Sequence, residues 1–124
     1  MAVMQSRDNR TFVAGEDLSA AQFKFVTLES DGQVDLADSA GENAIGVCIV
    51  GAGSGKAVTV TVAGSVMVEA GGTIAAGAAV QAGADGTALA AATGDVVLGY
   101  AREAAVDGQI IEIEMIQGGN VVPA

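Results

Sequence analysis

The sequence predicts an all-β fold, a small β-barrel or sandwich that is built from two similar halves and preceded by an extended N-terminal arm. Three observations support this prediction: apolar residues alternate with a period of two, Asp-Gly pairs separate the apolar runs, and the chain repeats itself internally. No window longer than about ten residues keeps a capped helical stripe. We therefore expect at most one short helix or turn, at "LSAAQF" (18–23).

The longest regular segment is "VTVTVAGSVMVE" (58–69), which alternates as a half-buried strand does. It predicts an inward face of valines and an outward face of threonines. The inward residues are Val58, Val60, Val62, Val66 and Val68, and the outward residues are Thr59 and Thr61.

A second alternating strand is expected in "QIIEIEMI" (109–116), and "FKFVTL" (23–28) and "AIGVCIV" (44–50) have the length of shorter strands. In the second strand Ile111, Ile113 and Met115 point inward and Glu112 and Glu114 outward. Glycine tolerates positive φ, so Asp-Gly pairs indicate tight turns between strands. These pairs are Asp31-Gly32, Asp85-Gly86 and Asp107-Gly108.

The internal repeat indicates the architecture. Four segments match in order: 14–26 with 70–82 (Leu18 over Ile74), 30–34 with 84–88, 45–47 with 98–100, and 54–62 with 107–115. The offset drifts from 56 to 53, as insertions in loops would cause. Two units of this length are too few for a solenoid, so we expect two halves that share one core. The predicted organisation is an arm at 1–13 and one β domain at 14–124, with repeats at 14–66 and 70–119.

The composition predicts a thin core. The 124 residues suit one domain, and 51% are hydrophobic, but 25 are alanine and aromatic residues make up only 3%. Because few bulky side chains are available for burial, a partner surface is expected to supply the rest. This is a first indication of an oligomer.

The charge is strongly acidic and unevenly distributed. The chain carries −10, whereas residues 1–13 carry +1 from Arg7, Arg10 and Asp8. An acidic body repels phosphate, so no nucleic-acid partner is expected. Residues 70–84 are uncharged but too short and glycine-rich for a membrane span, and the N-terminus lacks a signal-peptide core. We expect synthesis in a cytoplasm-like compartment and no membrane partner.

Groups that carry chemistry are scarce. The chain has no histidine, so the commonest general base and metal ligand is missing, and nothing beside Lys24 or Lys56 supports a nucleophile. The single cysteine, Cys48, lies in an apolar run and is expected to be buried and inert. Glu112 and Glu114 are interpreted as a solvated face. The sequence predicts no enzyme, no catalytic residue, no cofactor and no metal.

The N-terminal arm is the one candidate binding segment. It is polar and basic, and it contains Arg7, Arg10 and Phe12. Arginine and aromatic residues are typical interface anchors, and an extended segment can add to the edge of a partner's sheet. The bland alternative is a frayed tail.

Taken in order, these elements resemble the small capsid decoration (cement) proteins of tailed bacteriophages. The resemblance covers the arm and the segments 14–38, 44–86 and 96–116, with glycine turns, "VEAGG" (68–72) and alternating valines in sequence. It implies a β-tulip-like fold and a homotrimer on the outer capsid surface at three-fold or quasi-three-fold sites. The implied partner is the major capsid protein, bound through Arg7, Arg10 and Phe12. The implied location is the virion.

Two alternatives stay open. "GSGKAVTVTV" followed by "EAGGTIAAGAAV" is similar to lipoyl or biotinyl carrier domains, with Lys56 as the modified lysine. No acidic residue or methionine precedes Lys56 as that family requires. The other alternative is a generic β-module of a fibre or adhesin, which would need aromatic side chains on which sugars can stack. The chain has one tyrosine, Tyr100, and no tryptophan.

Overall fold

The computed structural model describes residues 6–92 and 94–116, with side chains from Asp8 onward. Within this part of the chain every regular element is a strand, which confirms the all-β prediction. The strands are β1 (Ser6–Val13), β2 (Lys24–Leu28), β3 (Val34–Leu36), β4 (Gly46–Val50), β5 (Ala57–Glu69), β6 (Ala79–Ala82), β7 (Ala88–Ala90), β8 (Gly99–Ala101) and β9 (Ile110–Met115).

Residues 18–23 form two successive turns and no helix. Ala21 N donates to Leu18 O (3.0 Å), and Lys24 N then donates to Ala21 O (3.1 Å). The predicted Asp-Gly turns are also present, because Gly32, Gly86 and Gly108 have φ of 81°, 81° and 88°.

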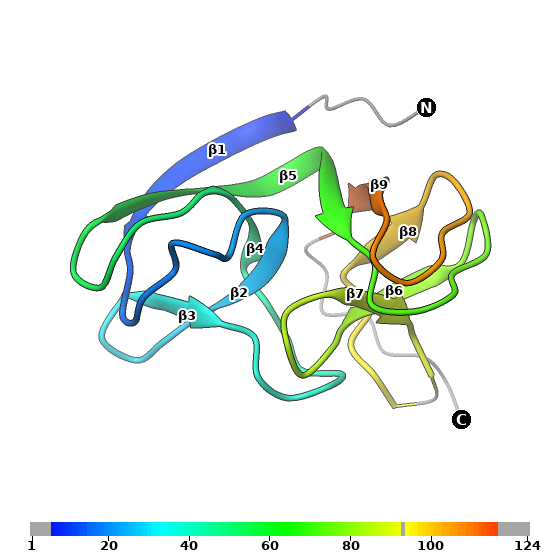
Figure 1. Cartoon of the computed structure of the whole chain (residues 1–124), viewed down its shortest axis with the longest axis horizontal. Coiled ribbons are helices and arrows are strands. Elements are labelled where there is room, and N and C mark those ends of the chain that lie inside the picture. The colour runs from blue at the N-terminus through cyan, green and yellow to red at the C-terminus, as the bar shows by residue number, and fades with distance from the viewer. Residues whose placement is uncertain (1–5, 93, 117–124) are drawn as a thin grey trace.

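One antiparallel sheet curls into a half-barrel (Figure 1). Its strand order is β3-β2-β4-β5-β9-β8-β6-β7, and β1 pairs with β5 beside this path. Figure 1 shows two lobes, with β1 to β4 in one and β6 to β9 in the other.

The long strand β5 passes from one lobe to the other. Its first part pairs with both β1 and β4, and its second part, Ser65–Glu69, pairs with β9. Gly64, with φ of 88°, lies between the two parts. Val58, Val60, Val66 and Val68 are buried as predicted, and Val62 is partly buried. Thr61 differs from the prediction of an outward face: it is fully buried, and its hydroxyl donates to Asn9 Oδ1 (2.7 Å).

Backbone hydrogen bonds recur along the chain at offsets of 53 to 56 residues. Gly32 N donates to Glu29 O (3.0 Å), as Gly86 N does to Gly83 O (3.1 Å). The left-handed residue Phe23, with φ of 65°, corresponds to Gly77 with φ of 82°. Each of these two N–H groups donates over 2.7 Å, to Cys48 O and to Ala101 O respectively.

The same correspondence includes β1. Phe12 of β1 pairs with Val58 in the first part of β5, and Val68 in the second part of β5 pairs with Ile111 of β9. The pair formed by β1 and the first part of β5 is therefore repeated by the second part of β5 and β9. Residues 6–13, predicted as an arm, are therefore a strand of this chain's own sheet. We call 6–62 the first half and 65–116 the second half.

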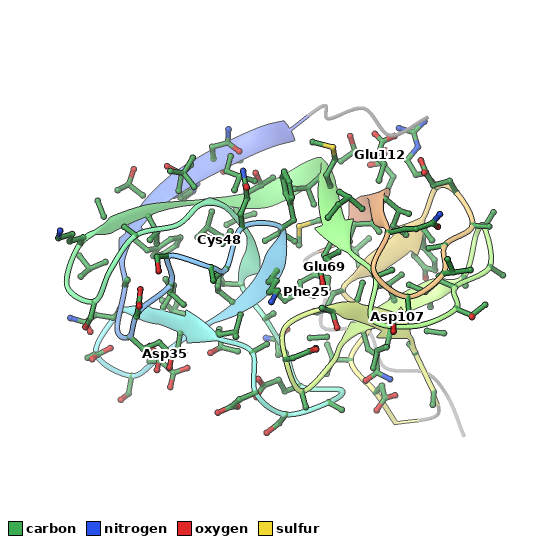
Figure 2. The ribbon with its side chains drawn as sticks, in the orientation of Figure 1. Phe25, Asp35, Cys48, Glu69, Asp107 and Glu112 are labelled. Carbon is green, nitrogen blue, oxygen red and sulfur yellow. The ribbon has the colours of Figure 1, made fainter. Side chains whose placement is uncertain are left out.

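The core has two clusters. The smaller one lies within the first half, around Leu18, Val26 and Cys48. The larger one fills the second half and also includes Phe25 and Val47 of the first half. Figure 2 places Phe25 between the two lobes.

Candidate functional site

An open depression of about 380 Å³ lies where β1 pairs with the first part of β5. Its floor is apolar and an arginine and an aspartate stand at its side. The lining residues are Asp8, Arg10, Phe12, Ile45, Val62 and Ala63. Two of the three predicted site residues, Arg10 and Phe12, therefore meet at one surface.

The strand register explains why these two residues share a side of β1. Arg10 pairs with Val60 and Phe12 with Val58, so both follow the inward parity of β5. Phe12 is half-buried against the core of the first half. The side chain of Arg10 is 62% exposed, and its guanidinium lies 2.9 Å from Asp8 Oδ2. The side chain of Arg7 lies outside the described residues, so its predicted role stays a prediction.

Sequence reasoning missed Ile45, which completes the apolar floor, and assigned Val62 to the core alone. Both are only partly buried. Their counterparts in the repeat, Leu98 and Met115, are buried. A comparison of the aligned halves could not have found this difference, because all four residues are apolar and only their surroundings differ.

The two glutamates of β9 do not form the predicted solvated pair. Glu112 is only 3% exposed, and its Oε2 accepts from Arg102 Nη1 (2.9 Å). Glu114 is half exposed and lies 3.4 Å from the same guanidinium. The prediction was wrong for Glu112, because the arginine at the end of β8 covers and neutralises it. Figure 2 shows Glu112 on the lobe that holds β9.

The remaining candidates for chemistry are separate from one another. Cys48 is fully buried, and burial raises the pKa of its thiol, so it is an inert core residue as predicted. Lys56 is exposed at the turn before β5, where its carbonyl accepts from Ala14 N (2.9 Å). Among the described residues, no three acidic, cysteine or histidine side chains gather as a metal site would require.

Two aspartates have perturbed pKa values. Asp35 has a buried carboxylate oxygen without a hydrogen bond, and burial, followed by repulsion from Glu16 and Glu29, raises its pKa. The pKa of Asp85 is lowered mainly by the hydroxyl of Thr87, which donates to its Oδ1. Asp35 lies within β3 and Asp85 in the turn before β7, and neither lines the depression.

The described part of the chain offers no helix long and apolar enough to cross a membrane. The surface depression is the strongest candidate site, and it is suited to contact with a protein surface, since it joins apolar residues to an exposed arginine side chain that Asp8 holds in place.

Comparisons with known proteins show the family and the fold of this chain. A family model described as phage cement protein matches residues 4–115. A solved structure, the head fiber gp8.5 N base of bacteriophage phi29, is similar over 88% of this chain and 93% of that chain, with a TM-score of 0.70 and 21% sequence identity. That similarity shows the fold. No curated protein sequence matches this chain.

Proposed function

This chain belongs to the phage cement protein family, and we propose that it forms a homotrimer that seats on the outer capsid surface at three-fold or quasi-three-fold sites and stabilises the shell. The family is structural and not enzymatic, so the chain is a component of a phage virion capsid. The single observation that carries the proposal is the family match across residues 4–115.

Physical features of the chain support the proposal. The core is rich in alanine and valine, and Phe25 is its one fully buried aromatic residue among those described. Such a core gains stability from contact with further copies. The acidic charge of −10 keeps free copies soluble before they meet a shell.

We place capsid attachment at the N-terminal segment, with Arg7, Arg10 and Phe12 as its residues. β1 pairs only with β5 within the described residues, so its other edge can meet a partner strand. The exposed guanidinium of Arg10 can reach a carboxylate of the major capsid protein. Phe12, being half-buried, holds β1 in place beneath that contact.

The proposed stabilisation works by number. Each seated trimer joins neighbouring capsid subunits, and a ligand that binds only the assembled shell stabilises it by mass action. When one trimer holds several contacts, the later contacts form at high effective concentration. No single contact needs to be strong.

The finer architecture belongs to the same proposal. We regard the two similar halves of a β-tulip-like barrel as one duplicated unit, with the predicted repeats at 14–66 and 70–119 and with the predicted arm at 1–13 contributing β1 (Ser6–Val13) to the first half. The recurring turn bonds at Gly32 and Gly86 support this view. The second repeat extends past residue 116, outside the described residues.

The experiment compares binding to empty shells that lack this protein. Deleting residues 1–13 would remove a whole strand, so we choose removal of 1–5 combined with Arg7→Glu, which leaves Arg10 and the depression unchanged. Co-sedimentation should fall about fivefold or more, because a lost charged contact costs about 1 kcal/mol or more. Lys56→Glu, an equal charge change at an exposed turn, is the matched control and should bind as the parent does. Full binding by the arm variant would contradict the arm assignment. Absence of binding by the parent chain would contradict the capsid proposal.

A further inference from the structure

The contact between the two halves joins different faces of the repeated unit. The first half contributes an inserting face, made of Phe25, Ala37, Ala44 and Val47. The second half contributes a receiving face, made of Val66, Val68, Leu98 and Met115. All eight residues belong to one buried cluster, so the first half closes the core of the second.

Backbone hydrogen bonds reinforce this contact. Glu69 N donates to Phe23 O and Phe25 N to Gly86 O, each over 2.8 Å. Gly41 bonds twice, since its N–H donates to Ala82 O (2.9 Å) and its carbonyl accepts from Val96 N (3.1 Å). Together these bonds fix how one half sits on the other.

Each half also carries the face that it does not use. We call a face free where the other half of the described chain does not cover it, whatever bonds its residues make. At the repeat offsets, the free receiving face of the first half consists of Arg10, Phe12, Ile45 and Val62, which line the depression. The free inserting face of the second half consists of Ala79, Ala91, Val97 and Tyr100. Within one chain the inserting face of the first half contacts the receiving face of the second half. This head-to-tail contact leaves the receiving face of the first half and the inserting face of the second half unused.

The free faces are more exposed than the joined ones. Tyr100 is 44% exposed, whereas its counterpart Val47 is fully buried. Ala79 and Ala91 are partly exposed where Phe25 and Ala37 are buried, while Val97 and its counterpart Ala44 are both buried.

The bonded positions follow the same rule. The backbone groups that bond across the halves have counterparts, at the repeat offsets, that lie on exposed residues. Ala79 is the exception, since it is partly exposed. The exposed counterparts are Val13, Leu28, Gly32, Asn43, Gly77 and Gly94.

We propose that the free inserting face of one copy docks on the free receiving face of the next, so that the contact between halves is repeated between chains. This deepens the proposed homotrimer and rests on that part of the proposed function alone, not on the capsid. The docking takes Arg10 and Phe12 for the contact between copies and leaves Arg7 for attachment to the capsid. The predicted bonds join Ala79 N to Gly32 O and Gly94 N to Leu28 O across two chains.

Residue chemistry on the free faces favours a partner that arrives as a separate chain. Arg10 stands where the second half has buried Val66, and Tyr100 stands where the first half has Val47. Arginine and tyrosine are enriched in the centres of protein interfaces and stay soluble before assembly. A second copy is the occupant that already carries the complementary shape.

Strand continuity points to the same occupant. Met115 at the end of β9 and Ser6 at the start of β1 both correspond to Val62 in the middle of β5. In the docked pair, the end of β9 in one copy would therefore lie beside the start of β1 in the next. The two strands would repeat the path that β5 takes without a break.

The contact is heterologous, so it continues from copy to copy until the ring closes. Three copies give six halves, joined alternately by the chain and by the docked faces. This is how the proposed trimer would close without a two-fold contact.

Engineered cysteines test the contact at one point. A Cβ placed at Gly86 would lie 3.2 Å from Lys24 Cβ across the halves, slightly under the roughly 3.5–4.5 Å Cβ separation of a disulfide, and 2.6 Å from Leu36 Cδ1, so the flexible end of Leu36 must shift to admit it. The counterparts of these residues are Gly32 and Ala78. The double variant G32C/A78C should form disulfides between chains when diamide accepts the two electrons and two protons of each thiol pair.

Three controls define the result. K24C/G86C should form a disulfide within one chain. G32C or A78C alone should stay uncrosslinked, and an equal mixture of these two single variants should give covalent dimers and nothing larger. The native Cys48 is fully buried and does not compete.

The expected result is a covalent trimer of G32C/A78C on a non-reducing gel. A trimer by light scattering that gives no crosslink, while K24C/G86C does, would overturn the docking and leave the proposed trimer standing. A monomer by light scattering would overturn both. Crosslinking by G32C alone would show a two-fold contact and overturn the head-to-tail arrangement. A cysteine at Gly32 is strained because Gly32 has positive φ, so a second variant avoids this position. Tyr100→Glu places a charge on the free inserting face, and its mass by light scattering is expected to be that of a monomer.

Discussion

The two halves of this chain share their strand pairing and differ in what lies over it. Phe12 on Val58 in the first half repeats as Val68 on Ile111 in the second. Nevertheless, Val68 is fully buried and Phe12 only half-buried, because the first half covers the second and no element of the described chain covers the first. A repeated unit can thus have one closed core and one open core within the same chain.

The difference shows that position in the repeat does not determine a residue's environment. Arg10 and Val66 occupy the same place in the ladder, one exposed and one fully buried. At two positions, Arg10 and Tyr100, the free faces carry an amphipathic residue where the joined faces have a valine, as suits a partner that arrives by diffusion. The comparison can be tested by changing one half at a time.

The largest effect is expected from Phe25→Ala, which removes the largest side chain of the joined inserting face. Phe25 is fully buried between the lobes (Figure 2), so the loss of packing and the remaining cavity should lower the free energy of unfolding by about 3–5 kcal/mol. Urea denaturation followed by circular dichroism measures this change.

Val106→Ala is the matched control, because Val106 is 54% exposed and should change the stability by less than about 0.5 kcal/mol. If Phe25→Ala were as stable as this control, the contact between the halves would not be the closure of the larger core.

Local patterns predicted the strands and turns well. Val58, Val60, Val66 and Val68 point inward because a period of two leaves no other arrangement with one buried face, and Asp-Gly pairs turn because glycine accepts positive φ.

Features that depend on distant contacts could not be predicted. Thr61 and Glu112 follow the outward parity and are buried all the same, through Asn9 and Arg102 respectively. β1 carried no period-two signal of its own, because Arg10 occupies an inward position beside Phe12. The depression depends on which half covers which, and a repeat in sequence does not determine that arrangement.

A smaller effect separates the two equivalent Asp-Gly turns. Asp85 Oδ1 accepts from the N–H (3.2 Å) and hydroxyl (2.5 Å) of Thr87, which is buried, whereas Asp31 Oδ1 accepts from Gln33 N (3.0 Å) alone among the described residues. Asp85→Ala would leave the buried Thr87 without these partners and should cost about 1–2 kcal/mol at neutral pH. Asp31→Ala, the matched control, should cost less.

The pH dependence of this effect has a definite sign. Because the folded-state pKa of Asp85 is lowered from 3.8, its stabilisation is present above pH 3.8 and is lost as the pH falls through the folded value. The difference in unfolding free energy between the parent and Asp85→Ala should therefore shrink below pH 3.8. A difference that grew on acidification would contradict the hydrogen-bonded carboxylate.

The smallest effect concerns Asp35, whose counterpart in the second half is Leu89. Its unpartnered buried oxygen and the nearby Glu16 and Glu29 raise its pKa, so at neutral pH the fold carries an unfavourable charge. Asp35→Asn should raise the free energy of unfolding by roughly 0.5 kcal/mol at pH 7. A raised folded-state pKa means that the parent loses stability as the pH rises through that value, while below 3.8 the carboxyl is protonated in both states. The advantage of Asn should thus vanish below pH 3.8 in thermal denaturation followed across that range, and an advantage equal at every pH would show that charge is not its cause.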